Sequence, residues 1–103
     1  MTAATTALPT KGEFSQQIDQ TFRAIGPGGA EFDLQLVEFH DVLDTEAQET
    51  FSMIFRGPAE MPPAQTIYRL SNEELGEHDI FLVGVRQDAS GTYFEAVFNR
   101  LKR

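Results

Sequence analysis

The amino-acid sequence predicts a mainly β domain: a small antiparallel barrel or compact sandwich of about five to six strands, with one short N-terminal helix. Two observations lead to this prediction. From residue 32 onward, apolar and polar residues alternate with a period of two, which is the spacing of a half-buried strand. Turn residues interrupt this alternation at short intervals, as they do where consecutive strands pair as neighbours.

The chain has the size and composition of a single globular domain. It has 103 residues, of which 41% are hydrophobic and 23% charged. Residues 1–10 are expected to form an N-terminal arm, because they carry one proline, no charge and no periodicity. Residues 11–103 then form a single small β domain, in which no internal repeat is apparent.

The helix is predicted from the spacing of three apolar residues after the arm. Phe14, Ile18 and Phe22 lie at i, i+4 and i+8, which places them in one stripe on a helix that ends before Gly26. Such a helix is expected to close one end of a sheet or barrel. The sequence GPGGAE is then a turn, because Pro27 fixes φ and the glycines after it permit positive φ.

The strands follow this turn. They are predicted at residues 32–42, 49–57, 66–70, 80–87 and 92–101. The alternation changes phase at Val37, which indicates a bulge or a strand with both faces partly covered. The segment 80–87 is apolar on both faces and predicts a central strand. SNEELGEHD, residues 71–79, is expected to be a polar link, and DASG, residues 88–91, a hairpin turn.

A proline-rich stretch separates the second and third of these strands and holds three of the five prolines of the chain. Gly57 and Pro58 end one strand. Pro62 and Pro63 keep the path extended, because proline cannot donate to a sheet ladder. Thr66 begins the next strand. The stretch is therefore predicted to be a stiff crossover within the fold.

The composition excludes several classes of function. A formal net charge of −8 opposes nucleic-acid binding, because affinity for phosphate backbones comes largely from lysine and arginine that displace counterions. The absence of cysteine removes disulfides, thiolate catalysis and cysteine-ligated zinc. No apolar run approaches the roughly 20 residues of a membrane helix, and the N-terminus lacks the pattern of a secretory signal. The cellular compartment stays open.

Candidate catalytic residues are few. Glu38 and His40 project to the same side of their predicted strand, so the carboxylate can orient the imidazole. His78 also has carboxylates beside it, but nothing in the spacing brings the two histidines together as metal ligands. No nucleophile elbow or phosphate-binding loop is present. We expect no enzymatic activity, cofactor or metal. The alternative is a small-molecule-binding or catalytic β-barrel with a site near Glu38 and His40.

The charged residues indicate protein contacts instead. Residues 1–51 carry nine acidic and two basic groups, whereas residues 52–103 carry seven and six, and the chain ends on the basic sequence NRLKR. Opposite charges at the two ends either favour head-to-tail contact between copies or belong to a solvated terminal tail with no role, which is the commoner case. Arginines also flank the proline-rich stretch, where they either protect sheet edges or hold an acidic group of a partner. The residues expected to contact a partner are Leu8, Arg56, Met61, Arg69, Arg100, Lys102 and Arg103.

Several motifs give the chain a family resemblance. They are FRGP at 55–58, YRL at 68–70, ELGEHDIFLV at 74–83 and YFEAVFNR at 93–100. Over about residues 13–101 the chain resembles a family of small uncharacterised bacterial proteins, a domain of unknown function with a Phe-Arg-Gly-Pro turn and a closing Tyr-Glu-Ala-Val-Phe-Asn strand. Two positions depart from that pattern: Gly84 stands where a proline is expected, and Phe94 is an extra residue in the closing strand.

The resemblance implies no activity and no catalytic residues. It associates the chain with phage-tail-collar-like proteins, which implies a role in a tail-derived or extracellular filament. Together with the charge pattern, it predicts a non-enzymatic structural or interaction subunit that contacts copies of itself or a tail-like partner. A neighbour's N-terminal arm is one candidate strand for an exposed sheet edge.

Overall fold

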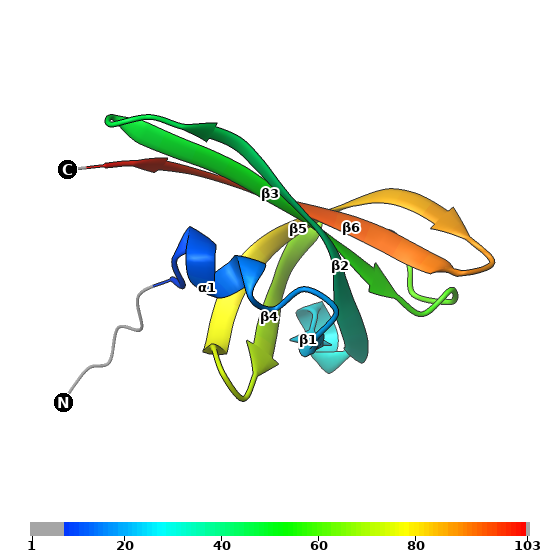
Figure 1. Ribbon diagram of the computed structural model, residues 1–103. Coiled ribbons are helices and arrows are strands. Elements are labelled where there is room, and N and C mark those ends of the chain that lie inside the picture. Colours follow the sequence, from blue (N-terminus) through cyan, green and yellow to red (C-terminus); the bar gives the residue numbers. More distant parts are fainter. Residues whose placement is uncertain (1–7, 103) are drawn as a thin grey trace, which may run out of the picture.

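The computed structural model describes residues 8–102. They form a closed barrel of six antiparallel strands preceded by a short helix (Figure 1). In chain order the elements are α1 Lys11–Ser15, β1 Thr21–Ile25, η1 Pro27–Gly29, β2 Glu31–Asp44, β3 Gln48–Gly57, β4 Thr66–Asn72, β5 Gly76–Asp88 and β6 Gly91–Leu101. The predicted fold class is confirmed, in its barrel form. Most of the predicted arm, residues 1–7, lies outside the described residues.

The barrel is built from two three-stranded meanders. The strand order is β1-β2-β3-β6-β5-β4, so β1–β2–β3 and β4–β5–β6 each run as consecutive antiparallel strands. They join along β3 and β6, and again where β1 pairs with β4. At this second junction Ala24 lies opposite Leu70, and both are buried. The small alanine side chain leaves room for the leucine where the barrel closes.

β1 and β2 have counterparts 46 residues later in β4 and β5. Arg23 lies opposite Asp33, and Arg69 lies opposite Asp79 in the same way. Each arginine Nε donates to its aspartate, at 3.0 Å and 3.1 Å. The matching segments are EFDLQLV at 31–37 and EHDIFLV at 77–83. The two hairpins therefore share a cross-strand ion pair and a short similar segment at a constant offset of 46 residues.

α1 is shorter than the predicted helix. Its N-terminus carries a capping box, in which the Thr10 hydroxyl accepts from the Glu13 backbone N–H at 3.1 Å and the Glu13 carboxylate accepts from the Thr10 N–H at 2.9 Å. The helix ends at Ser15. Asp19 then adopts a left-handed conformation (φ 69°), which an α-helix does not continue through. No helix among the described residues has the length and apolar character to cross a membrane.

Phe22 belongs to β1 and not to the helix, which corrects the prediction of one apolar stripe. Phe14 and Phe22 are both buried, but Ile18 between them is 38% exposed. The chain turns between Ile18 and Phe22, so the two phenylalanines reach the core from different elements. Pairing of β1 with both β2 and β4 outweighs the local helical spacing, because it closes the barrel.

The other strands follow the predicted alternation. The phase change at Val37 is a bulge, because the β2–β3 register shifts between Leu36 and Glu38. The hairpin turn at 88–91 is confirmed, with Asp88 opposite Gly91. The predicted polar link at 71–79 instead contains the turn of the β4–β5 hairpin, because β4 continues to Asn72 and β5 begins at Gly76.

The proline-rich stretch is a strap over one end of the barrel, at residues 58–65. The side chain of Met61 is fully buried, and its carbonyl accepts from the hydroxyl of the buried Thr92 at 2.7 Å. The strap also lies directly on β5, because a Cβ added at Gly84 would come within 2.6 Å of the Pro63 carbonyl oxygen. The stretch is a crossover between β3 and β4, as predicted. Its contact with β5 explains why a residue without a side chain stands at position 84.

β2, β3 and β6 continue beyond the barrel as a three-stranded sheet, here called the extension (residues 37–44, 48–54 and 96–101; Figure 1). α1 lies against its inner face. The Phe14 ring is centred 6.1 Å from that of Phe51 and 5.3 Å from that of Phe98. Phe39 stacks on Phe51 at 5.6 Å. These four rings hold the helix, the extension and the barrel together.

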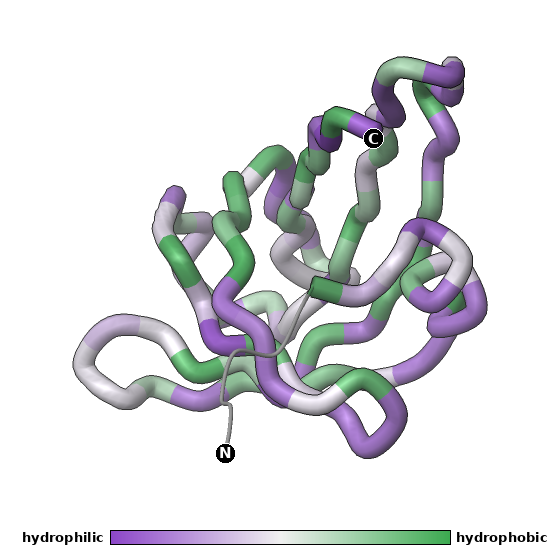
Figure 2. The backbone as a smooth tube through the Cα atoms, turned by 90° about the vertical axis from the view of Figure 1, so that its left-hand side faces the viewer, coloured by the Kyte–Doolittle hydropathy of each residue, from purple (hydrophilic) through white to green (hydrophobic). Residues whose placement is uncertain are grey.

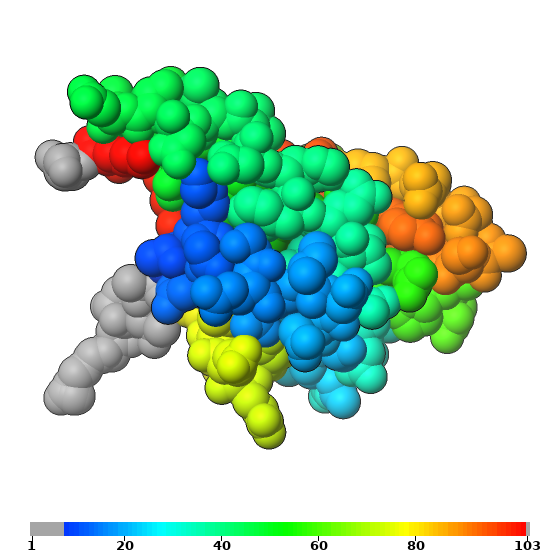
Figure 3. Space-filling model, viewed as in Figure 1, coloured from blue at the N-terminus to red at the C-terminus, as the bar shows by residue number. Residues whose placement is uncertain are grey.

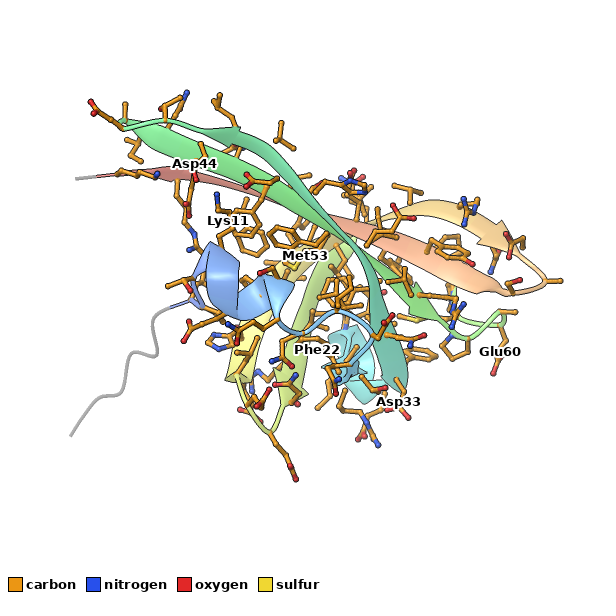
Figure 4. The ribbon with its side chains drawn as sticks, viewed as in Figure 1. Lys11, Phe22, Asp33, Asp44, Met53 and Glu60 are labelled. Carbon is orange, nitrogen blue, oxygen red and sulfur yellow. The ribbon has the colours of Figure 1, made fainter. Side chains whose placement is uncertain are left out.

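The core lies inside the barrel and continues under the extension. Its fully buried large side chains come from α1, the strap and five of the strands, and Figure 4 labels one of them, Met53, among the side chains between the strands. They are Phe14, Phe51, Phe55, Phe94, Leu34, Leu36, Met53, Met61, Leu70 and Leu82. Figure 2 shows the alternation of apolar and polar residues along the strands that produces this inward set.

Replacing Phe14 with alanine should lower the free energy of unfolding by about 3 kcal/mol, because it removes a buried ring between two others. Ile18→Ala is the control, with an expected loss of less than about 1 kcal/mol. Urea unfolding followed by circular dichroism measures both. Equal losses would support the single helical stripe predicted from the sequence and contradict the observed path.

Gly84→Ala should lower the free energy of unfolding by about 1–3 kcal/mol, because its Cβ meets backbone atoms of the strap that cannot swing aside. At Gly12, in contrast, an added Cβ has its nearest neighbour 3.9 Å away, at the Thr10 hydroxyl. Gly12→Ala is therefore expected to be neutral or stabilising by up to about 1 kcal/mol. Melting temperatures of the two variants give the comparison, and an unchanged G84A melt contradicts the strap contact.

Candidate functional site

A polar hollow of about 620 Å³ lies between the end of α1 and the β4–β5 turn. Its lining is Gln16, Gln17, Asp19, Gln20, Thr21, Asn72, Glu73 and Glu74. Gln17, only 3% exposed, donates its amide to Glu74 at 2.7 Å and accepts from the Asn72 amide at 2.8 Å. Its hydrogen bonds tie α1 to the β4–β5 hairpin, so the buried polar group in this hollow has a structural role.

An apolar groove of about 270 Å³ lies between η1 and the strap. Its lining is Gly26, Pro27, Ala30, Phe32, Pro62, Ala64, Thr66 and Tyr68. Burial raises the pKa of the Tyr68 hydroxyl. The lining carries no charged side chain, so the groove offers mainly apolar contact.

Glu38 and His40 form the pair predicted from their spacing. The imidazole Nε2 lies 2.8 Å from the Glu38 Oε1, and both side chains are about half exposed on the outer face of β2. Neither residue lines the two hollows described above. Among residues 8–102, no group of three or more histidine, aspartate or glutamate side chains is placed to hold a metal ion. The pair is an exposed strand contact without convergent polar groups around it.

His78 is buried, although its neighbours in the sequence suggest a solvated position. It is 8% exposed, and its Nε2 lies 2.6 Å from the carbonyl oxygen of Leu75. A carbonyl oxygen only accepts hydrogen bonds, so Nε2 is the ring nitrogen that donates in this contact. His78 thereby supports the β4–β5 turn, at which the Leu75 N–H donates to the Asn72 side chain at 2.8 Å.

The residues predicted to contact a partner near the proline-rich stretch have different environments. Met61 is fully buried in the core of its own chain, so it is not available to a partner. Arg56 donates to Gln35 at 2.6 Å and is half-buried. Arg69 is exposed and pairs with Asp79 within its own sheet. Leu8 is 45% exposed. These four side chains do not converge on one surface patch around the strap.

The basic C-terminus is largely neutralised within the chain. Arg100 donates to the carbonyl of Pro9 at 2.6 Å, lies 3.7 Å from the Glu49 carboxylate and covers the Phe51 ring. Lys102 forms an ion pair with Asp44. The third predicted basic residue, Arg103, lies outside the described residues. Within the described part of the chain, the NRLKR sequence therefore anchors the N-terminal segment and the extension.

The extension leaves one edge of β6 without a neighbouring strand. β6 pairs with β3 along its whole length, but its pairing with β5 begins at Gly91 and stops at Glu95. In the described part of the chain, residues Ala96–Leu101 therefore have a strand on one side only. Unpaired N–H and C=O groups on such an edge accept a further strand.

The opposite edge of the extension, on β2, is protected. Its register with β3 shifts twice, between Leu36 and Glu38 and between Asp41 and Leu43. Bulges of this kind twist an edge out of the plane in which another strand adds. Charged side chains also stand along it, at Glu38, Asp41 and Asp44, beside the exposed apolar side chains of Val42 and Leu43. The register of β6 with β3 is regular from Gln48–Leu101 to Gly57–Thr92, so only β6 presents a regular edge.

Apolar side chains stand on the outer face of the open edge. Val97 is 55% exposed and Leu101 80% exposed, with Asn99 between them on the same face. The predicted contact residues did not include these two. The sequence does indicate them. Phe94, Ala96 and Phe98 are the inward positions of this strand, so apolar residues at the alternate positions must face outward. A strand that is apolar on both faces at an open edge favours contact with another protein.

Comparison with known proteins places the chain in a family. The model of the family described as Domain of unknown function (DUF6916) matches residues 9–98. No curated protein and no solved structure matches significantly. The match covers the barrel and most of the extension.

Asp44 at the end of β2 is predicted to be acid-sensitive. Lys102 and then Lys11, whose Nζ lies 2.5 Å from the carboxylate, lower the pKa of Asp44 from 3.8 to about 2. Because the folded pKa lies below the unfolded one, this contribution to stability is complete above about pH 4 and is lost as the pH falls through about 2. Asp44→Asn should therefore reduce the fall in melting temperature between pH 4 and pH 2.

The matched control for that measurement is Glu46→Gln. Glu46 lies in the same hairpin and makes no ion pair among the described residues. It should keep the acid sensitivity of the original chain. If the melting temperature of D44N falls between pH 4 and pH 2 by as much as that of the original chain, the two lysine contacts do not stabilise the fold.

Proposed function

Because the chain belongs to the DUF6916 family, whose description assigns no activity, we propose its function from its own surface: a non-enzymatic subunit that acts by binding protein. It serves as a structural or interaction component of an assembly that contains copies of itself. The observation that carries this proposal is the open β6 edge at Ala96–Leu101 with its exposed apolar side chains.

The charge of the molecule supports a protein partner. The net charge of −8 opposes approach to nucleic acid. Locally, Arg100 and Lys102 on the extension pair with Glu49 and Asp44, so residues 96–102 present no unpaired cationic side chain. An edge with neutral and apolar side chains suits strand addition, in which backbone hydrogen bonds give affinity and side-chain contacts give specificity.

The second part of the proposal is that this assembly is tail-like or filamentous. It rests on the resemblance of the FRGP turn and the closing YFEAVFNR strand to proteins associated with phage-tail-collar-like genes. The open edge accommodates any assembly built by strand addition, so the two parts of the proposal are tested separately. The first measurement is self-association, and the second is the shape of the assembly by electron microscopy.

The alternative of a small-molecule-binding or catalytic barrel has less support. The inward side chains of the strands fill the interior of the barrel. The Glu38–His40 pair stands exposed on the outside, and neither residue lines the polar hollow or the apolar groove. A binding site normally combines a concave pocket with convergent polar groups.

The full chain should self-associate in a concentration-dependent way, with a mass above the 11.5 kDa of one chain in light scattering and sedimentation velocity. The double variant Val97→Lys, Leu101→Lys should shift the mass to that of the monomer, because charges on an edge strand oppose strand addition. The control is Ile67→Lys, Phe81→Lys, a cross-strand pair of similar exposure on β4 and β5. A full chain that stays monomeric at hundreds of micromolar contradicts the proposed self-assembly.

A further inference from the structure

We propose that two copies of this chain associate through their β6 edges, in an antiparallel pair whose two-fold axis passes at Asn99. This inference rests on the proposed function and names its partner and register. The pairing joins the two extensions into one sheet of six strands, three from each copy. Residues 96–102 of one copy lie opposite residues 102–96 of the other.

Self-complementarity is the first argument for this arrangement. A two-fold interface brings the same patch of both copies together, so each residue must tolerate its symmetry-related partner. In antiparallel strands, residues directly opposite one another lie on the same face of the sheet. A two-fold axis at Asn99 therefore places Val97 of each copy opposite Leu101 of the other. The interface therefore contains the contact between these two exposed apolar side chains twice, once on each side of the axis.

The faces of β6 exclude most other registers. Side chains 97, 99 and 101 point outward and 96, 98 and 100 inward, so the axis must pass at a residue and not between two residues. An axis at Phe98 would place Leu101 opposite Glu95, which already pairs with Val83 of its own barrel. An axis at Arg100 would place two arginines opposite each other, which is unfavourable. Asn99 is the position that uses the whole open edge without either conflict.

The charges of the extension permit this approach. With the axis at Asn99, Arg100 lies opposite Phe98 and Lys102 opposite Ala96, so no like charges face each other. Both basic side chains already have partners in their own chain, because Glu49 lies 3.7 Å from Arg100 and Asp44 pairs with Lys102. Strand addition therefore does not require either pair to break.

The arrangement also agrees with which face of the extension is already covered by the chain itself. The inner face of the extension is covered by α1, whose Phe14 ring packs on Phe98 and Phe51. Figure 3 shows α1, in blue, lying against the green atoms of the extension. The edge and the outer face are left for the second copy, and Val97 and Leu101 lie on that outer face.

Cysteine pairs test the register, because the chain has no cysteine of its own. Opposite residues in an antiparallel pair have Cα atoms about 4.5–5.5 Å apart, which is within the range of a disulfide. Asn99→Cys should therefore form a disulfide dimer under mild oxidation at about 10 μM protein. It should form at least about tenfold faster than a dimer of Ile67→Cys, because association raises the effective concentration of the two thiols.

A mixing experiment tests the register independently of Asn99. Val97→Cys alone and Leu101→Cys alone should each crosslink no faster than Ile67→Cys, since a two-fold axis at Asn99 separates the like thiols by about 14 Å. An equimolar mixture of V97C and L101C should form the mixed disulfide at least about tenfold faster than either variant alone. Thermal melts of the variants establish that each remains folded.

The results separate this inference from the proposed function. If the full chain associates and V97K/L101K abolishes association, but N99C and the V97C–L101C mixture crosslink no faster than I67C, the symmetric register is wrong and the interaction function stands. If deletion of residues 1–7 abolishes association while the crosslinks fail, the added strand is the arm of a neighbour and the symmetric pair is overturned. A full chain that is monomeric at every concentration overturns both.

Discussion

The pairing of β3 with β6 is the interaction on which the rest of the structure depends. It runs without a register shift from Gln48 opposite Leu101 to Gly57 opposite Thr92. One half of this ladder joins the two meanders into the barrel, and the other half forms the backbone of the extension. Because the same two strands serve both parts, the extension is rigidly connected to the barrel core. A surface on β6 therefore has a fixed orientation relative to the whole molecule.

A three-stranded sheet outside a barrel has little apolar burial of its own, and here the N-terminal segment supplies it. Phe14 completes a cluster with Phe39, Phe51 and Phe98, and aromatic pairs at these separations add to the stabilisation from burial. The hydrogen bond from Arg100 to the carbonyl of Pro9 then fixes the start of α1 beside β6. The short helix therefore matters for the shape of the extension more than for closing the barrel.

Sequence reasoning predicted the elements whose pattern is local and missed those that depend on partners distant in the chain. The alternation around Met53 and the bulge at Val37 were readable, because one face of each strand is buried. Phe22 was assigned to the helix because its spacing from Phe14 fits both structures, and only pairing with β2 and β4 decides between them. Met61 looked exposed in a proline-rich loop, yet the strap folds back onto Thr92 and buries it.

The candidate interface was missed for a similar reason. Charge in the sequence drew attention to Arg100 and Lys102, but their partners Glu49 and Asp44 lie more than fifty residues away in the chain. The two edges of the extension differ as a result of such distant contacts. β2 also exposes apolar side chains, at Val42 and Leu43, but its bulges and acidic side chains oppose strand addition. β6 has a regular register and exposed Val97 and Leu101. Since a chain that only avoided aggregation would protect both edges alike, this asymmetry supports the proposal that β6 accepts a partner strand.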